Sequence, residues 1–312
     1  MVVAACTRLS ASNPSFFEEE SSLAKMVTFP KEQAGGKPAD DPQNEMDQMI
    51  LTRKQVENVR RWIDDPDREV MFNMNLPHEP GPRLDPAQIE DMDKAGVGVF
   101  GHTTIIEPAD YKLYESYIFR PLRNPDEPKV MISVWDMNTP TPLVEARVMI
   151  RVLCPDGIDS WLVICAPAPS FHTALEGNIL GWPNCVADEM SVNRDRSEVI
   201  YEGEVGLSME FKSIHIDDAA VTELKRSGNE FGNTVSFVPS GGRTCLVRQG
   251  TGDPEPGIHF AEWETGMIQT YSRPEDPWSG LIPANGVTPG MWQRFYDTGD
   301  NPASGMYKVK GV

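Results

Sequence analysis

The amino-acid sequence predicts an α+β protein, mainly antiparallel β, with a strongly curved or closed sheet. From about residue 98 onward, short apolar runs alternate with turn signals that contain Gly, Pro, Asn or Asp. Most of these runs are joined by hairpin-length connections without βαβ alternation, which favours antiparallel pairing. Hydrophobic residues make up 39% of the 312 residues, enough to bury a core. Many short strands of this kind are typical of a sheet that curves or closes on itself.

Three segments are predicted along the chain. Residues 1–46 are polar and lack periodicity, which indicates a flexible N-terminal extension and linker. Residues 47–97 are interpreted as a helical arm laid over a main β domain at 98–312. The internal Met26 leaves open whether the first 25 residues belong to the native protein.

Helical periodicity predicts helices at 53–64, 111–118, 217–226 and 288–299. The first follows a capping box formed by Thr52 and Gln55. Asp217 caps the third, and Gly228 is its expected stop. Thr288-Pro289 opens the fourth, which we expect to bury the apolar residues Met291, Trp292 and Phe295.

Apolar runs predict strands at 129–135, 143–153, 160–166, 198–210, 234–238, 243–249 and 265–271. Between the second and third strands, the segment Cys154-Pro-Asp-Gly157 supplies a hairpin turn in which the glycine can adopt a positive φ.

Charge and composition exclude several function classes. The formal net charge of −19, without a basic stripe, argues against nucleic-acid binding. No apolar stretch approaches the roughly 18 residues needed to cross a membrane. The five cysteines lack CxxC spacing and the five histidines lack metal-site spacing, so free thiols, a cytoplasmic location and no metal or cofactor are expected. The expected partner is a small-molecule substrate, and homo-oligomer formation is left open.

The strand at 143–153 has two different faces. One face is wholly apolar, and the other carries Glu145, Arg147, Met149 and Arg151 at period two. This more polar face lines either a polar cavity or the solvent-exposed side of the sheet, where a local salt bridge would form.

A second segment, at 171–185, combines a helical turn that ends at glycine with the step Trp182-Pro183-Asn184-Cys185. Such a step would present Asn184 and Cys185 rigidly at the start of the next element. A plain helix-to-strand connection is the alternative interpretation.

Together these segments resemble the acetoacetate decarboxylase-like superfamily, over spaced fragments of about 125–300. Glu145 stands where that family has a strand glutamate, and Trp182-Pro183-Asn184-Cys185 stands at its aromatic-Pro-Lys-Lys step. Further fragments of the resemblance are Glu176-Gly177-Asn178, the segment 231–249 and Trp278-Ser-Gly280. The resemblance implies a cone-like antiparallel β-barrel with flanking helices and a buried, apolar-walled cavity for small keto acids. The family's decarboxylases form a Schiff base through the first lysine of the step.

This sequence departs from the family pattern at the reactive positions. Asn184 and Cys185 replace the two lysines, and Ser133 stands near the place of a second carboxylate. The family's N-terminal arginine has no match near 103–110. We therefore expect no decarboxylation through a Schiff base, unless another lysine such as Lys212 reaches the cavity.

The resulting hypothesis is a divergent enzyme of this family that acts on a small keto-acid or polyketide-like substrate, in secondary metabolism, by acid–base lyase, dehydratase or cyclase chemistry. Glu145, its pKa raised by burial, would move the proton, and Asn184 would hydrogen-bond a carbonyl or enolate oxygen. The expected substrate contacts are Trp182, Arg147, Ser133, Cys185 and His172. A non-catalytic binding protein on the same barrel is the alternative.

A further hypothesis assigns Cys185 as a nucleophile and His172 as its base. The competing interpretation is a half-buried, inert thiol.

Overall fold

The computed structural model describes residues 70–73, 84–136, 144–179, 181–229, 233–240, 243–249, 258–297 and 305–309. The expected extension at 1–46 and the expected helix at 53–64 lie outside these ranges.

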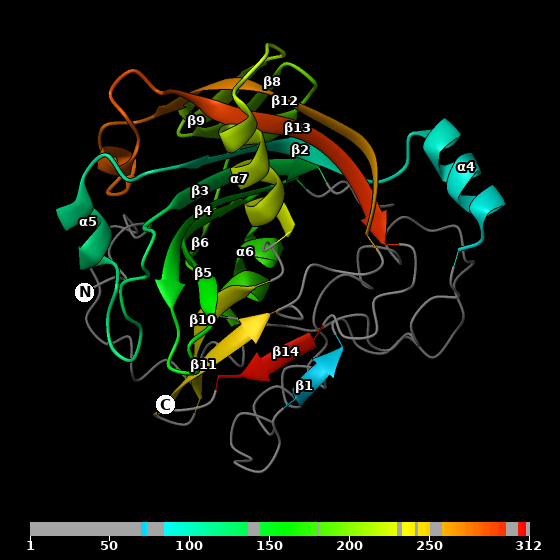
Figure 1. Cartoon of the computed structure of the whole chain (residues 1–312). Helices are drawn as coiled ribbons and strands as arrows, with labels where there is room; N and C mark the ends of the chain where they lie inside the picture. Colours follow the sequence, from blue (N-terminus) through cyan, green and yellow to red (C-terminus); the bar gives the residue numbers. More distant parts are fainter. Residues whose placement is uncertain are drawn as a thin grey trace.

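The described strands form one large sheet, which curves strongly around the central strands (Figure 1). Its members are β1 (Val70–Asn73), β2 (Val99–Ile106), β3 (Val130–Asp136), β4 (Val144–Leu153), β5 (Asp159–Ala168), β6 (Asn184–Val186), β7 (Glu189–Val192), β8 (Arg196–Tyr201), β9 (Glu204–Lys212), β10 (Thr234–Ser240), β11 (Arg243–Gln249), β12 (Ile258–Ser272), β13 (Val287–Asp297) and β14 (Gly305–Lys308). The helical elements are α4 (Pro86–Ala95), α5 (Tyr111–Ser116), α6 (Phe171–Ile179), α7 (Asp218–Asn229) and the 3₁₀ turn η2 (Ser279–Leu281).

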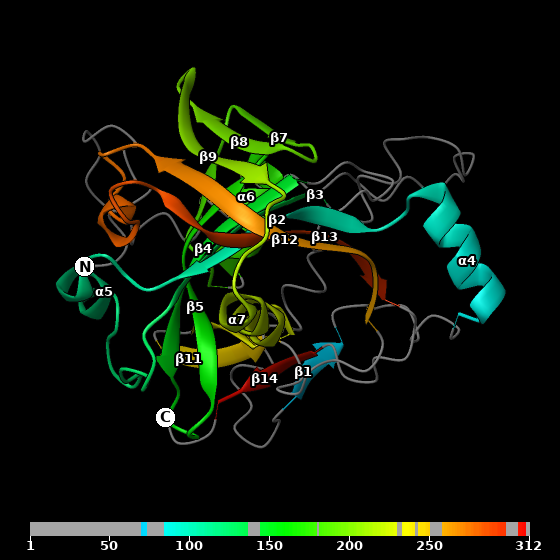
Figure 2. The same cartoon turned by 45° about the horizontal axis from the view of Figure 1, so that its top comes forward.

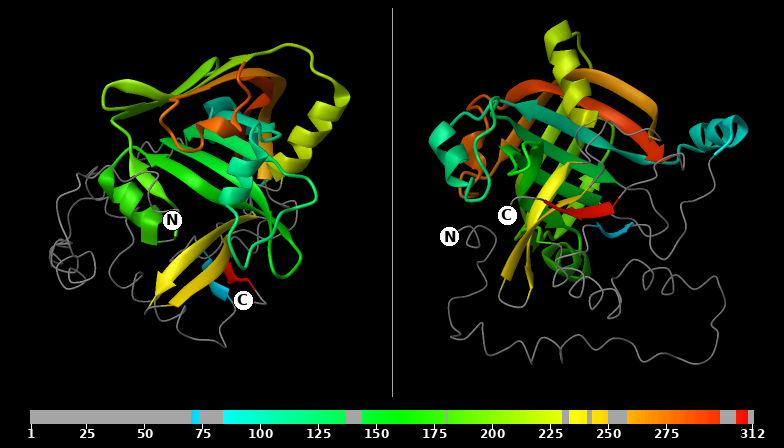
Figure 3. Two further views of the ribbon diagram at one scale, coloured as in Figure 1. Left: turned by 90° about the vertical axis from the view of Figure 1, so that its left-hand side faces the viewer. Right: turned by 60° about the horizontal axis from the view of Figure 1, so that its bottom comes forward.

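The strand order is β1-β14-β11-β10-β5-β4-β3-β2-β13-β12-β9-β8-β7, and β6 also pairs with β5. All pairings are antiparallel except β10–β5 and β5–β6, which are parallel. Strands β10 and β11 therefore lie at the opposite end of the sheet from the β8–β9 hairpin (Figure 3). The predicted α+β, mainly antiparallel and curved fold is confirmed. In the described part of the chain, β1 and β7 are the two ends of the strand order and do not pair with each other, so the sheet is not a closed barrel.

The central strands are buried on both faces. On the inner face of the curve, β7 lies against β3 and β4 and encloses one apolar core, which includes Val134, Ala146 and Val148. On the other face, α7 packs on β2 and β13 and covers a second core, which includes Met131 and Met149. Figure 2 shows β7, β8 and β9 on one side of the central strands and α7 on the other.

The prediction of a helix at 288–299 is wrong, because residues Val287–Asp297 form the strand β13. Its helical-looking spacing arises from burial on both faces: Met291 packs in the core under α7, and its neighbour Trp292 packs in the inner core. Adjacent residues on a strand point to opposite faces, so both can be apolar only where the sheet is covered twice.

Other elements differ from prediction at their turns. The single strand expected at 198–210 is the hairpin β8–β9, whose turn residues Glu202 and Gly203 both have positive φ values of 52° and 78°. Asp217 caps α7 as expected, but the helix continues through Gly228 to Asn229. Strand β2 and helix α4 were not predicted from the sequence, although a capping box of Asp85 and Gln88 opens α4.

A buried histidine ties two distant parts of the curved sheet. His102 of β2 is fully buried, and its Nε2 lies 2.8 Å from the carbonyl oxygen of Arg194. Because a carbonyl can only accept, Nε2 donates, and Nδ1 accepts a 2.6 Å hydrogen bond from the Ser197 hydroxyl of β8. Burial lowers the pKa of His102 from 6.5 to about 4, so the ring is neutral at pH 7.

This histidine makes stability depend on pH. Its pKa is lower in the folded than in the unfolded chain, so the unfolded chain binds the extra proton between pH 6.5 and about 4. The His102 contribution is complete above pH 6.5 and is lost as the pH falls to about 4. We expect on the order of 3 kcal/mol of unfolding free energy to be lost across this window.

The measurement is urea denaturation of the wild type and of His102→Gln at several pH values. The variant should be less stable at pH 7 but should show a shallower loss toward pH 4. His215→Gln, at an exposed position, is the matched control and should keep the wild-type slope. Parallel slopes in all three proteins would contradict the assignment.

Candidate active site

Strand register brings most of the predicted site residues to one face of the sheet. Ser133 of β3 lies directly opposite Arg147 of β4, and Asn184 of β6 is the partner of Ala166 on β5. Directly paired residues share a face, and Glu145 is on the same face as Arg147 by period two. Ser133, Glu145 and Arg147 are all buried, so this face lines the interior rather than solvent.

A buried ion pair lies at the centre of this face. Arg147 Nη2 donates to Glu145 Oε2 at 2.7 Å, and both side chains are less than one-tenth exposed. The guanidinium carbon lies 4.3 Å from the ring centroid of Trp182, within cation–π distance. Charge-assisted hydrogen bonds of this length are among the stronger hydrogen bonds in proteins. The result is a base and a cation held side by side against a flat aromatic wall.

The Trp182 turn is fixed by close backbone packing where the outer edge of β5 changes partner. One end of β5 pairs with β10 and the other with β6. Between them, Gly181 has φ 82°, and a Cβ at that position would lie 2.4 Å from the Phe237 carbonyl oxygen. The backbone N–H of Trp182 then donates a 2.8 Å hydrogen bond to the carbonyl oxygen of Gly177. Glycine at 181 is therefore required for both the backbone angle and the close approach.

Asn184 carries an unpartnered polar atom. Its Oδ1 is buried and accepts no hydrogen bond. The amide packs directly on Gly177 of α6, where a Cβ would lie 2.2 Å from Oδ1. A buried acceptor without a partner is destabilising, so this atom indicates a ligand or solvent donor at the site.

The structure does not bring Cys185 to this face. Consecutive strand residues point to opposite faces, and Cys185 packs against the inner core with Sγ 3.6 Å from the Tyr201 hydroxyl. His172 lies in the first turn of α6, and its side chain is outside the described part of the molecule. The predicted Cys185–His172 pairing therefore stays a prediction. Lys212 is exposed at the end of β9.

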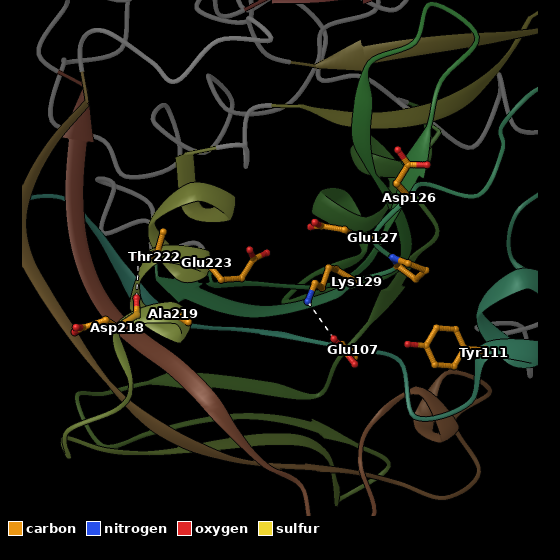
Figure 4. A pocket seen from close by; sticks show the side chains of 10 residues that line it. Glu107, Tyr111, Asp126, Glu127, Lys129, Asp218, Ala219, Thr222 and Glu223 are labelled. Atoms are coloured by element: carbon orange, nitrogen blue, oxygen red, sulfur yellow. Dashed lines mark hydrogen bonds and ion pairs between the residues drawn. The ribbon is translucent and has the colours of Figure 1, made fainter.

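A groove opens on the same face, at the other end of β3 and β4. It has a volume of about 790 Å³ and is separated from the ion pair by the buried Met131 and Met149. Its lining consists of Glu107, Tyr111, Asp126, Glu127, Pro128, Lys129, Asp218, Ala219, Thr222 and Glu223. Figure 4 shows the α7 residues on one side of the groove and residues 126–129 on the other.

Carboxylates dominate the groove. The Lys129 ammonium lies 3.6 Å from the Glu107 carboxylate. At the edge of the groove, the buried Arg151 guanidinium pairs with Glu127 at 3.6 Å and with Asp159 at 3.0 Å. A groove of this charge disfavours polyanionic ligands. The sequence analysis missed it, although Lys129 falls on the site face by period two from Ser133.

The described residues contain no group of three or more His, Cys, Asp or Glu side chains arranged to hold a metal ion. Among the described helices, none combines the length and the apolar character needed to span a bilayer. The four described cysteines are free thiols.

Comparison with solved structures identifies the fold. No family model and no curated protein matches the sequence. The structure is similar to acetoacetate decarboxylase from Legionella pneumophila, with a TM-score of 0.50 and 15% identity, over 69% of this chain and 86% of that one. The fold is that of acetoacetate decarboxylase.

Two further solved structures are similar to this chain at lower TM-scores. An acetoacetate decarboxylase-like enzyme from Sphingomonas wittichii has a TM-score of 0.47 and 11% identity, over 69% of this chain and 92% of that one. The enduracididine biosynthesis enzyme MppR, complexed with pyruvate, has a TM-score of 0.45 and 11% identity, over 68% of this chain and 87% of its own.

Unfolding free energies of variants test whether Glu145 and Arg147 form a buried ion pair. Removing Arg147 alone should leave a buried, uncompensated carboxylate, so Arg147→Met should lower the unfolding free energy by about 3 kcal/mol or more. The double variant Glu145→Met/Arg147→Met should recover most of this loss, because no buried charge remains.

The matched control is Arg196→Met, which breaks the exposed Arg196–Glu198 pair. Its effect should stay within about 0.5 kcal/mol. Denaturant unfolding of the four proteins measures the differences. A double variant no more stable than Arg147→Met would contradict the uncompensated-charge explanation.

Proposed function

We propose that this chain is a divergent acetoacetate decarboxylase-like enzyme that performs acid–base chemistry, without a Schiff base, on a keto-acid or polyketide-like substrate. The observation that carries the proposal is the buried Glu145–Arg147 pair against Trp182. Buried ion pairs contribute little net stability, so a pair placed on an aromatic wall is more easily explained by a ligand than by folding.

Each side chain then has a role in forming an enolate. The Glu145 carboxylate removes the proton from the carbon next to a ketone. The Arg147 guanidinium binds the substrate carboxylate or the oxygen on which negative charge develops. Asn184 contributes its amide to the same oxygen or accepts from a substrate hydroxyl. In a dehydratase step the enolate then expels a β-hydroxyl, which leaves as water with the proton from Glu145. In a cyclase step the enolate carbon bonds to a second carbonyl carbon of the substrate, whose oxygen takes that proton.

Neither Lys129 nor Lys212 offers a replacement for the missing Schiff-base amine. A nucleophilic lysine is activated by desolvation or by a cationic neighbour. Lys129 instead lies beside carboxylates in the groove, and Lys212 is exposed. Iminium chemistry at Asn184 is therefore not part of the proposal.

A non-catalytic small-molecule-binding protein on the same fold is the second candidate. The observation in its favour is that Glu145 is already engaged by Arg147 through a 2.7 Å hydrogen bond, as it would be in a site that only recognises a ligand. Both candidates place the protein in the cytoplasm with a small-molecule partner. They differ in whether a bound keto acid loses a proton to Glu145.

The acid–base proposal predicts hydrogen exchange at carbon. The protein is incubated in D₂O with pyruvate or with one of a panel of longer 2-keto acids. NMR should then show protein-dependent incorporation of deuterium at the carbon next to the ketone. Glu145→Gln should slow this exchange at least about 100-fold, because the base is removed while the amide keeps the shape. Glu198→Gln, at a partly exposed position on β8, is the control and should be unaffected. Binding of a keto acid without any exchange would instead favour the second candidate.

The absence of an amine at Asn184 predicts the result of borohydride trapping. Reduction in the presence of pyruvate or acetoacetate should leave the intact mass of the protein unchanged, since no iminium forms. Asn184→Lys treated in the same way is the positive comparison. A lysine adduct in the wild-type protein, located by peptide mass spectrometry, would overturn the proposed chemistry.

A further inference from the structure

A row of residues crosses the sheet on the same face as the candidate site. Glu145 on β4 is opposite Trp135 on β3, which is opposite Gly101 on β2. Gly101 in turn is opposite Gln293 on β13, which is opposite Trp263 on β12. Direct partners share a face, so all five residues lie in one line on the face covered by α7. The row extends the site well beyond the ion pair.

The far end of this row holds two buried polar atoms without partners. Gln293 is 3% exposed, and its Oε1 accepts no hydrogen bond. The indole Nε1 of Trp263, its direct strand partner, is buried and donates none. The Cβ atoms of such partners lie roughly 5 Å apart, yet the acceptor and the donor do not bond each other. One inserted group able both to donate and to accept would satisfy both atoms.

Aromatic rings line the row beside these two atoms. The Trp135 indole lies over Gly101, where a Cβ would be 2.6 Å from its Cδ1. Phe295 contacts Trp135 edge to face at 5.4 Å, and Phe260 contacts Trp263 in the same manner at 5.4 Å. Such surroundings favour a flat, apolar or aromatic group over a hydrated chain.

We propose that Gln293 and Trp263 form a second subsite, which binds the hydroxyl of an aromatic ring. The hydroxyl donates to Gln293 Oε1 and accepts from Trp263 Nε1. This deepens the proposed function and rests on it for the other end of the ligand. β13 lies three strand spacings from β4, roughly 14 Å, so the ligand is longer than a three- or four-carbon keto acid. A hydroxyaryl keto acid has the required chemistry at both ends.

Two pairs of probes that differ only in the hydroxyl test the subsite by calorimetric titration. They are 4-ethylphenol against ethylbenzene, and 4-hydroxyphenylpyruvate against phenylpyruvate. The wild type should bind each hydroxylated probe about tenfold more tightly. Gln293→Leu should remove that preference, and Trp263→Phe, which keeps the ring and deletes the donor, should reduce it. Gln269→Leu, at an exposed glutamine on β12, should retain it.

The outcomes separate this subsite from the acid–base proposal. Glu145→Gln should leave the hydroxyl preference unchanged even where it abolishes proton exchange. Gln293→Leu should keep or raise the melting temperature, since it removes an unsatisfied buried group. Equal affinity within each pair, no binding of any probe, or a preference that survives both subsite variants would overturn the inference.

Discussion

Burial of the central strands on both faces is the constraint on which the rest of this structure depends. The curve of the sheet covers one face with β7–β9, and α7 covers the other. A buried polar side chain on β2, β3 or β4 therefore cannot hydrogen-bond to bulk water. Its hydrogen-bond partner must come from a neighbouring strand or from a ligand. Glu145 and Arg147 supply an ionic partner to each other, whereas Oδ1 of Asn184 and Oε1 of Gln293 accept no hydrogen bond.

Polar residues are buried on both covered faces of the sheet. On the inner face, His102 reaches Ser197 and the Arg194 carbonyl, so both ring nitrogens are satisfied. This contact ties β2 to β8 across the curve and belongs to the fold. On the face under α7, the unpartnered amides lie close to aromatic rings and to a charged pair. Satisfied polar groups indicate structure, and unsatisfied ones in an aromatic setting indicate a ligand.

The alternation of apolar and polar residues along one strand was the main basis for predicting the candidate site. The period-two pattern of residues 144–152 was sufficient to place Glu145 and Arg147 on one face, and the structure confirms that placement. The same logic fails at β13, because Met291 and Trp292 are both buried on opposite faces and imitate a helix. Gln293 and Trp263 could not be paired in advance. Their meeting depends on the register of β12 and β13, which no local pattern specifies.

Under the proposed function, the strand order gives a physical reason for Asn184 at the position of a Schiff-base lysine. Asn184 lies two strands from Arg147 on the same face, with Ala166 between them. The family's Schiff-base lysine needs a cationic neighbour, which makes its neutral form accessible. Here the cation is a guanidinium, which keeps its proton and is already paired with Glu145. A fixed cation can bind an enolate or a carboxylate without forming a covalent bond. Under the proposed function, such a site offers charge stabilisation without a nucleophilic lysine, a combination that suits proton transfer rather than decarboxylation through an iminium.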